Sequence, residues 1–240
     1  MKKIKKGKTI SVIMSIYQKL QKISPYLWFR YSNIIELLNL NALLKEFLNK
    51  HKNVRSMPTR LEYFSFINNE IILNQPITYL EFGAYKGESI LTWAKLNKND
   101  SSTFYGFDTF TGLPEDYTIN MKKGEFNLEG KVPKFDDHRI YLIKGLFQET
   151  LKPFLKNFER NNRLVIHLDA DLYSSTLYVL STVDQILEKG DILMFDEFSY
   201  PTGEFKAYIE WCSAFYRNPR MIVKEKGKSW VVDQVAFQIE

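Results

Sequence analysis

Short apolar runs alternate with helix-forming segments from residue 77 to the C-terminus. Runs rich in branched and aromatic residues, bounded by Gly, Pro, Asn or Asp, are typical of buried strands. We predict strands at 77–82, 103–107, 139–143, 164–168, 191–195, 221–225 and 235–239. Helices are predicted between them at 88–96, 150–158, 175–189 and 204–215. This alternation indicates an α/β fold with a doubly wound, seven-stranded, mostly parallel sheet and helices on both faces. The last two strands are spaced for a hairpin-like pair, so one strand is expected to be antiparallel.

The first 58 residues have a different pattern, and we predict a separate N-terminal helical extension. Apolar residues recur at helical spacing in residues 9–50, most densely at 35–48, and Pro25 divides this region into at least two helices. The Ser-Met-Pro-Thr stretch at 56–59 is a natural boundary. The predicted domains are therefore 1–58 and 59–240, the second opening with one amphipathic helix over 60–74.

Charge is distributed unevenly between these two parts. Residues 1–60 hold thirteen Lys or Arg and two Asp or Glu, a net charge of +11, whereas the remainder carries −6. The basic arm is a candidate contact to an anionic membrane surface, to a phosphate-bearing acceptor or to a second copy of the chain. No aromatic and basic module of a nucleic-acid-binding protein is present.

Cysteine content and hydropathy favour a cytoplasmic protein. Cys212 is the only cysteine, so an intrachain disulfide is excluded, which suits a reducing compartment. No apolar run approaches the roughly 20 residues that cross a bilayer. The apolar stretch after the first lysines is short and lacks a small-residue cleavage site, which disfavours a signal peptide.

Pairs of carboxylates follow two of the predicted strands. Asp169 and Asp171 come after the strand at 164–168, and Asp196 and Glu197 come after the strand ending at Phe195. Ligands of open α/β sheets bind at the carboxyl ends of the strands, where these side chains would meet. Four nearby carboxylates need a countercharge, and a divalent cation with oxygen ligands provides it, Mg²⁺ best and Mn²⁺ or Ca²⁺ next. Helix caps and solvated loop residues are the alternative interpretation.

The turn after the first strand has the features of a cofactor site. Gly83 and Gly87 allow the backbone to approach a ligand, and the next helix offers free N–H groups. The middle glycine of a dinucleotide-binding turn is missing, which disfavours an NAD-dependent dehydrogenase. Glu81, before the first glycine, suits a ligand with an ammonium group, and Asp108 at the end of the second strand can accept hydrogen bonds from a ribose diol.

These motifs together resemble a known family. The chain is similar to class I S-adenosylmethionine-dependent methyltransferases with a Rossmann-like fold, and more narrowly to the macrocin O-methyltransferases, which are metal-dependent sugar O-methyltransferases. Two elements are specific in combination, Gly-Phe-Asp-x-Phe-x-Gly-Leu-Pro at 106–114 and Asp-x-Asp-Leu-Tyr at 169–173. The resemblance covers residue 56 to the C-terminus, through the stretches 80–89, 105–114, 145–151, 167–176 and 195–198.

The resemblance implies a role for each matching residue. The cofactor-binding residues would be Glu81, Gly83 and Ser89 around the methionine part, Asp108 at the ribose, Gln148 at the adenine, Met57 as a cover, and Gly87 of the glycine turn. The metal ligands would be Asp169, Asp196 and Glu197, and Asp171 would be the general base. The family usually shows Asp-Asp or Asp-Asn where this chain has Asp196-Glu197. The longer Glu197 leaves open whether it binds the metal directly, through water, or not at all.

The expected activity is metal-dependent transfer of a methyl group from S-adenosylmethionine to a hydroxyl of a sugar or sugar-containing metabolite. A metal lowers the pKa of the acceptor hydroxyl, and a nearby carboxylate removes its proton. Two alternatives remain open from the sequence. One is an O-methyltransferase acting on a catechol-like diol, and the other is a non-catalytic cofactor-binding protein tethered through its basic arm. The long polar stretch at 115–137 is expected to be a functional loop that, with the arm, covers the acceptor.

Overall fold

The computed structural model describes residues 25–118, 120–226 and 234–240, together with residues 15 and 19. The chain divides into two compact units, residues 1–47 and 48–240. The first unit contains most of helix α2 (Pro25–Lys50), on which Ile34, Leu37, Leu38 and Leu43 are exposed. Most of the basic arm, including the predicted helix before Pro25, lies outside the described residues. None of the described helices has both the length and the apolar character needed to span a membrane.

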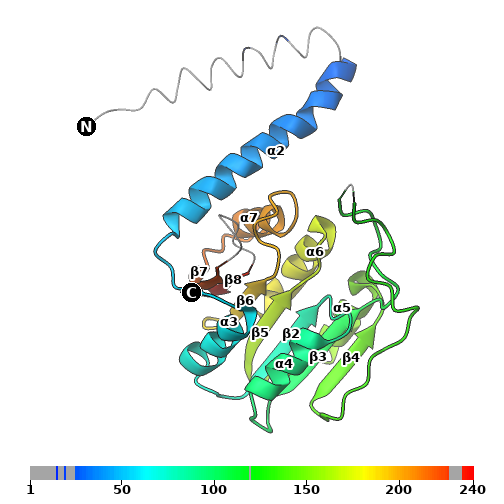
Figure 1. Ribbon diagram of the computed structural model, residues 1–240, viewed down its shortest axis with the longest axis vertical. Helices are drawn as coiled ribbons and strands as arrows, with labels where there is room; N and C mark the ends of the chain where they lie inside the picture. The colour runs from blue at the N-terminus through cyan, green and yellow to red at the C-terminus, as the bar shows by residue number, and fades with distance from the viewer. Residues whose placement is uncertain (1–14, 16–18, 20–24, 119, 227–233) are drawn as a thin grey trace. The chain divides into compact units, whose positions relative to one another are not determined.

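The second unit is built on one eight-stranded sheet (Figure 1). Its strand order is β1-β7-β8-β6-β5-β2-β3-β4. The strands are β1 (Ser56–Met57), β2 (Ile77–Phe82), β3 (Thr103–Asp108), β4 (Ile140–Lys144), β5 (Arg163–Leu168), β6 (Ile192–Phe195), β7 (Arg220–Glu225) and β8 (Val235–Gln238). Among the strands of the described residues, only β8 pairs antiparallel, with both β6 and β7. The doubly wound sheet with one antiparallel strand is therefore confirmed.

The eighth strand is the one that the sequence pattern did not predict. Strand β1 has two residues and pairs parallel with β7 through Ser56 and Met57. Two residues are too few to show the alternation by which a strand is recognised, so only the tertiary pairing reveals it. The predicted single helix over 60–74 is also interrupted: α3 (Arg60–Phe66) continues as a π-helical turn, η1 (Ile67–Ile71).

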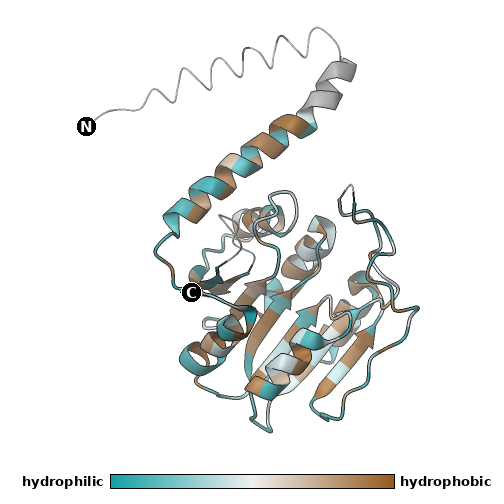
Figure 2. Cartoon of the chain, viewed as in Figure 1, coloured by the Kyte–Doolittle hydropathy of each residue, from teal (hydrophilic) through white to brown (hydrophobic). Residues whose placement is uncertain are grey.

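Helices cover both faces of the sheet because its central strands are buried on both sides. Every residue of β2 and β6 is buried, and Figure 2 shows these strands as mainly hydrophobic. One face packs against α3 and α4 (Glu88–Leu96), around Tyr63, Phe64, Tyr79 and Trp93. The remaining helices are α5 (Phe147–Lys156), α6 (Tyr173–Val183) with the 3-10 turn η2 (Asp184–Ile186), and α7 (Glu204–Ala214).

The alternation of side chains along the strands decides which residues can meet at the strand ends. Glu81 and His167 are cross-strand partners in β2 and β5, and His167 is opposite Met194 of β6. Side chains two residues apart share a face of the sheet. Asp169 and Asp196 therefore continue the face of His167 and Met194, which is the face that α3 covers.

Candidate active site

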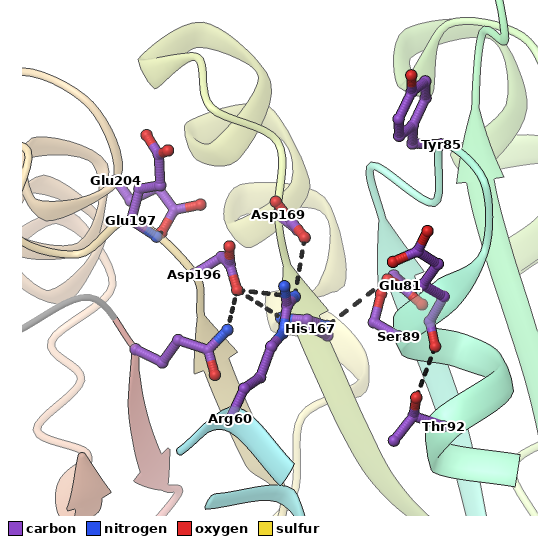
Figure 3. Close-up of polar contacts among 12 residues, drawn as sticks. Arg60, Glu81, Tyr85, Ser89, Thr92, His167, Asp169, Asp196, Glu197 and Glu204 are labelled. Carbon is purple, nitrogen blue, oxygen red and sulfur yellow. Dashed lines mark hydrogen bonds and ion pairs between the residues drawn. The ribbon is translucent and has the colours of Figure 1, made fainter. Parts of the chain in front are cut away.

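The two strand-end aspartates lie close together and share one arginine (Figure 3). Arg60 Nη2 lies 3.2 Å from Asp169 Oδ2 and 2.9 Å from Asp196 Oδ1. Asp196 Oδ1 also accepts a hydrogen bond from the Gln234 side-chain amide. Arg60 is the first residue of α3, so the helix that covers this face of the sheet delivers the countercharge.

Burial and mutual repulsion move the pKa values of the two aspartates in opposite directions. Burial, then the charge of Asp196, raise the pKa of Asp169 well above its usual range. Burial alone would also raise the pKa of Asp196, but the nearby His167 ring, the charge of Arg60 and the hydrogen bond from Gln234 lower it overall. Two carboxylates at one site behave in this way because both cannot ionise freely without a nearby cation.

His167 lies beneath the aspartates, fully buried within β5. Its Nδ1 is 2.8 Å from the Tyr79 hydroxyl, and its Nε2 is 3.7 Å from Asp196 Oδ1. Burial lowers the pKa of His167, which favours the neutral imidazole. The expected packing role in the core is therefore accompanied by a polar one, because one ring nitrogen is hydrogen-bonded to the Tyr79 hydroxyl.

The described residues include a group that could hold a metal ion. His167, Asp169 and Asp196 each offer a ligand atom, and these atoms all lie within 4.8 Å of one another. This group contains two of the three ligands expected from the sequence. The third, Glu197, instead accepts a hydrogen bond from the Tyr117 hydroxyl at 2.6 Å. Its backbone N–H donates to the buried carboxylate of Glu204 at 3.0 Å.

Asp171 combines an unusual backbone conformation with a perturbed carboxyl group. Its backbone has a φ of 57°, in the left-handed region that few residues other than glycine, asparagine and aspartate adopt readily. Burial, followed by the charges of Glu197 and Asp196, raises the pKa of Asp171 to about 7. A carboxyl group with a pKa near neutrality can both take up and release a proton at physiological pH.

The glycine turn after β2 is held against the end of β5. Gly83 has a φ of 102°, and a Cβ placed on it would lie 1.8 Å from the backbone oxygen of Asp169. The same turn is fixed to β3, because Gly83 N–H donates to Phe107 O and Tyr85 N–H donates to Asp108 Oδ2. Only glycine permits this close approach, which brings the turn, Asp108 and the carboxylate strand to one place.

A cavity of about 300 Å³ opens at this place. Of the residues proposed from the sequence, those that line it are Gly83, Asp108, Gln148, Asp169, Asp171, Asp196 and Glu197. The long loop contributes Phe126, whose ring meets that of Tyr85 edge-on, with 5.5 Å between centroids. The expected functional loop thus contains described residues that reach the site, Phe126 at the cavity and Tyr117 at Glu197.

Four of the residues proposed from the sequence, Met57, Glu81, Gly87 and Ser89, are not among the described residues that line this cavity. Glu81 is fully buried and accepts a hydrogen bond from Ser89. Burial raises the pKa of Glu81 to about 8. Gly87 precedes α4 with its Cα facing the ring of Phe135, and Met57 packs against the core cluster on the α3 face.

A second cavity, of about 450 Å³, adjoins the same carboxylates. It shares Arg60, Asp196 and Glu197 with the first cavity and is otherwise lined by Ser199, Tyr200, Glu225 and Gln234. The sequence interpretation did not include Arg60, Tyr117 or Gln234. No pattern distinguishes them from surface residues, since each reaches the site from an element distant in sequence.

The chain was compared with known proteins. Residues 80–198 match the family described as "Methyltransferase domain". The chain carries a methyltransferase domain. The match spans both the glycine turn and the carboxylate strands, so every residue that lines the first cavity, except Arg60, lies within the matched region. The prediction of a class I methyltransferase is therefore confirmed. No curated protein sequence matches the chain.

Solved structures of other methyltransferases share the fold of this chain. CalS11, a calicheamicin methyltransferase, is 22% identical, with 93% of this chain and 90% of that chain covered and a TM-score of 0.54. Its apo structure, described as a TDP-rhamnose 3'-O-methyltransferase, gives 24% identity, 94% and 93% coverage, and a TM-score of 0.54. The O-methyltransferase NovP is 17% identical, with 85% of this chain and 99% of that chain covered and a TM-score of 0.53.

Proposed function

We propose that this methyltransferase transfers a methyl group from S-adenosylmethionine to a hydroxyl of a sugar or sugar-containing metabolite, with the help of a divalent metal ion. The observation that carries the proposal is that Gly83, Asp108 and Gln148 line the same cavity as Asp169, Asp171 and Asp196. A methyl donor in the first group would be next to a hydroxyl held by the second.

The cofactor side of the cavity fits S-adenosylmethionine in its polar groups. The two oxygens of Asp108 accept backbone N–H groups from Tyr85 and Phe110, and each oxygen retains a lone pair for a ribose hydroxyl. Glu81 Oε2 is buried without a hydrogen-bond partner among the described residues. A buried carboxylate oxygen of this kind suits a nearby ammonium group, such as that of the methionine part of the cofactor.

The acidic side fits a divalent cation through Asp169 and Asp196, with His167 beneath them. Carboxylate oxygens suit Mg²⁺, and the neighbouring imidazole is compatible with Mn²⁺. When bound, the cation would lower the pKa of an acceptor hydroxyl. Asp171 would then take the proton from that hydroxyl, while the backbone of the Gly83 turn fixes the donor beside it.

The second cavity is the proposed acceptor site. Each residue that lines it carries a polar group, and it shares Asp196 and Glu197 with the cofactor cavity, so that an acceptor there would face the methyl donor. CalS11 is described as acting on TDP-rhamnose, and a sugar hydroxyl is the acceptor that we propose for this chain as well. The cytoplasmic location, and contact of the basic arm with a membrane surface or a second copy, stay predictions of the sequence.

The proposed function is tested with purified protein, S-adenosylmethionine and a panel of acceptors. The panel contains TDP-rhamnose, other nucleotide sugars, free sugars with vicinal hydroxyls, and a catechol. Methylation of a sugar, detected by mass spectrometry, supports the proposal. Methylation of the catechol alone would contradict the sugar part, and failure of S-adenosylmethionine to bind in calorimetry would contradict the whole.

Asp108 is expected to contribute to cofactor affinity. Changing Asp108 to Ala should weaken S-adenosylmethionine binding by about 1.5–3 kcal/mol, because charge-assisted hydrogen bonds to the ribose are lost. Calorimetric titration measures this, with thermal unfolding followed in parallel because Asp108 also holds two backbone N–H groups. A folded variant with wild-type affinity would exclude Asp108 from the ribose site.

Removal of divalent metal is expected to abolish turnover while leaving cofactor binding largely intact. EDTA would strip the cation from Asp169 and Asp196, whereas Asp108 and the glycine turn do not depend on it. Turnover should return when Mg²⁺ or Mn²⁺ is added in excess of the chelator. Full activity in EDTA would refute the metal role and leave the carboxylates with Arg60 as their cation.

A further inference from the structure

The guanidinium of Arg60 lies where a divalent cation would have to bind. One nitrogen, Nη2, is bonded to an oxygen of Asp169 and to an oxygen of Asp196, the two carboxylates that would hold the metal (Figure 3). Two cations cannot share these oxygens at contact distance, because their mutual repulsion in a partly desolvated site is large. Occupation by Arg60 and occupation by metal are therefore alternatives.

The ion pairs between Arg60 and the two aspartates have the features of contacts that another cation can displace. Only one of the guanidinium nitrogens bridges the two carboxylates, instead of the fork-like bidentate pairing that makes such ion pairs strong. Arg60 Nε is buried yet finds no acceptor within the described part of the chain. The Arg60 side chain is 42% exposed, so water can compete for the contact.

Displacement of Arg60 would act directly on a short segment of the chain. Arg60 begins α3, directly after the N-cap Thr59, whose hydroxyl accepts from Glu62 N–H. Two residues before the cap, Met57 lies in β1, at the edge of the sheet beside β7. The aspartate contact is thus one of the attachments that hold the first turn of α3 over the site.

We propose that Arg60 is a resident counter-cation, which neutralises Asp169 and Asp196 when no metal is present and is displaced when a divalent cation binds. Metal occupancy would then loosen the first turn of α3, the part of the chain beside the second cavity. This inference rests on the metal site of the proposed function. It adds that Arg60 competes with the metal ion for the two carboxylates, so that metal affinity is lower than the carboxylates alone would give.

Removing the competitor should strengthen metal binding. Mn²⁺ binding is measured by electron paramagnetic resonance for the wild-type protein and for Arg60→Gln, in which the charge is lost and a polar side chain remains. We expect at least about tenfold tighter binding in the variant, the size of one lost charge-assisted interaction. The Arg60 guanidinium lies over the ring of Phe64. Arg60→Met puts an uncharged, apolar side chain of similar length there, so it should behave alike and serves if the first variant does not fold.

A matched control removes the same charge elsewhere. Arg220 pairs with Glu240 at the exposed C-terminal edge, so Arg220→Gln changes the net charge equally without touching the site. Its Mn²⁺ affinity should equal that of the wild type. Unchanged or weaker binding in the Arg60 variants would overturn the inference, because Arg60 would then be a bystander or a support for the carboxylates.

Hydrogen exchange provides the second readout. In the wild type, saturating Mn²⁺ should speed amide exchange in the first turn of α3, and in Arg60→Gln that exchange should be fast with or without metal. Hydrogen exchange that is insensitive to Mn²⁺ in the wild type would overturn the proposed displacement of Arg60.

A separate measurement distinguishes failure of this inference from failure of the metal site. S-adenosylmethionine binding is measured in the same samples in EDTA. Intact cofactor binding with unchanged Mn²⁺ affinity rejects only the role of Arg60, whereas absence of Mn²⁺ binding from all proteins rejects the metal site as well.

Discussion

Changing Asp171 to Asn should lower kcat by about 10²–10⁴-fold, the usual cost of removing a general base. Asparagine cannot take up the acceptor proton, yet it has nearly the same size as aspartate. It also tolerates the left-handed backbone that the structure shows at this position, with a φ of 57°. The loss should therefore appear in turnover of the sugar identified with the acceptor panel, whereas Mn²⁺ and S-adenosylmethionine should still bind.

The control is the same substitution in the long loop. Asp116 is exposed and pairs with Lys122, so Asp116→Asn should leave kcat unchanged. The Asp171 variant must also retain its Mn²⁺ affinity, since loss of metal would lower turnover for a different reason. If Asp171→Asn turns over at a rate within a few fold of the wild type, the base is another group.

Changing Gly83 to Ala should lower the free energy of unfolding by about 2–5 kcal/mol and abolish cofactor binding. An alanine Cβ would lie 1.8 Å from the Asp169 backbone oxygen, so the turn and the end of β5 would have to separate. The left-handed φ of 102° adds strain of its own. Chemical denaturation measures the stability, and calorimetry measures binding of S-adenosylmethionine.

A control at Gly124 distinguishes the steric clash with Asp169 from the strain of a left-handed backbone. Its φ of 87° is also left-handed, but an added Cβ would meet no heavy atom of the described chain within 4 Å. Gly124→Ala should therefore cost only the backbone strain, about 1 kcal/mol, and leave cofactor binding intact. If the two alanine variants lose equal stability, the contact between the Gly83 turn and Asp169 is not what makes glycine necessary.

The sequence by itself determined the order of the strands along the chain and which residues follow each of them. Buried parallel strands are visible in the sequence as continuous apolar runs. The residue that follows each run must lie at the carboxyl end of that strand, because it is covalently joined to it. Asp108, Asp169 and Asp196 could therefore be assigned to the strand-end edge of a sheet from the pattern alone. Gly83 could be identified as a turn residue for the same reason, because the chain must reverse between an apolar run and a helix.

Only the tertiary structure decided how these residues share the site. Asp196 and Glu197 are neighbours in sequence, yet Asp196 turns toward Asp169 while Glu197 turns to Tyr117 of the long loop. The cation at the carboxylates is Arg60, from a helix 109 residues before Asp169. Contacts of this kind arise from side-chain direction and from packing between distant elements, which no local pattern records. Covalent order therefore placed the carboxylates at the sheet edge, and packing chose which of them face one another and which cation they meet.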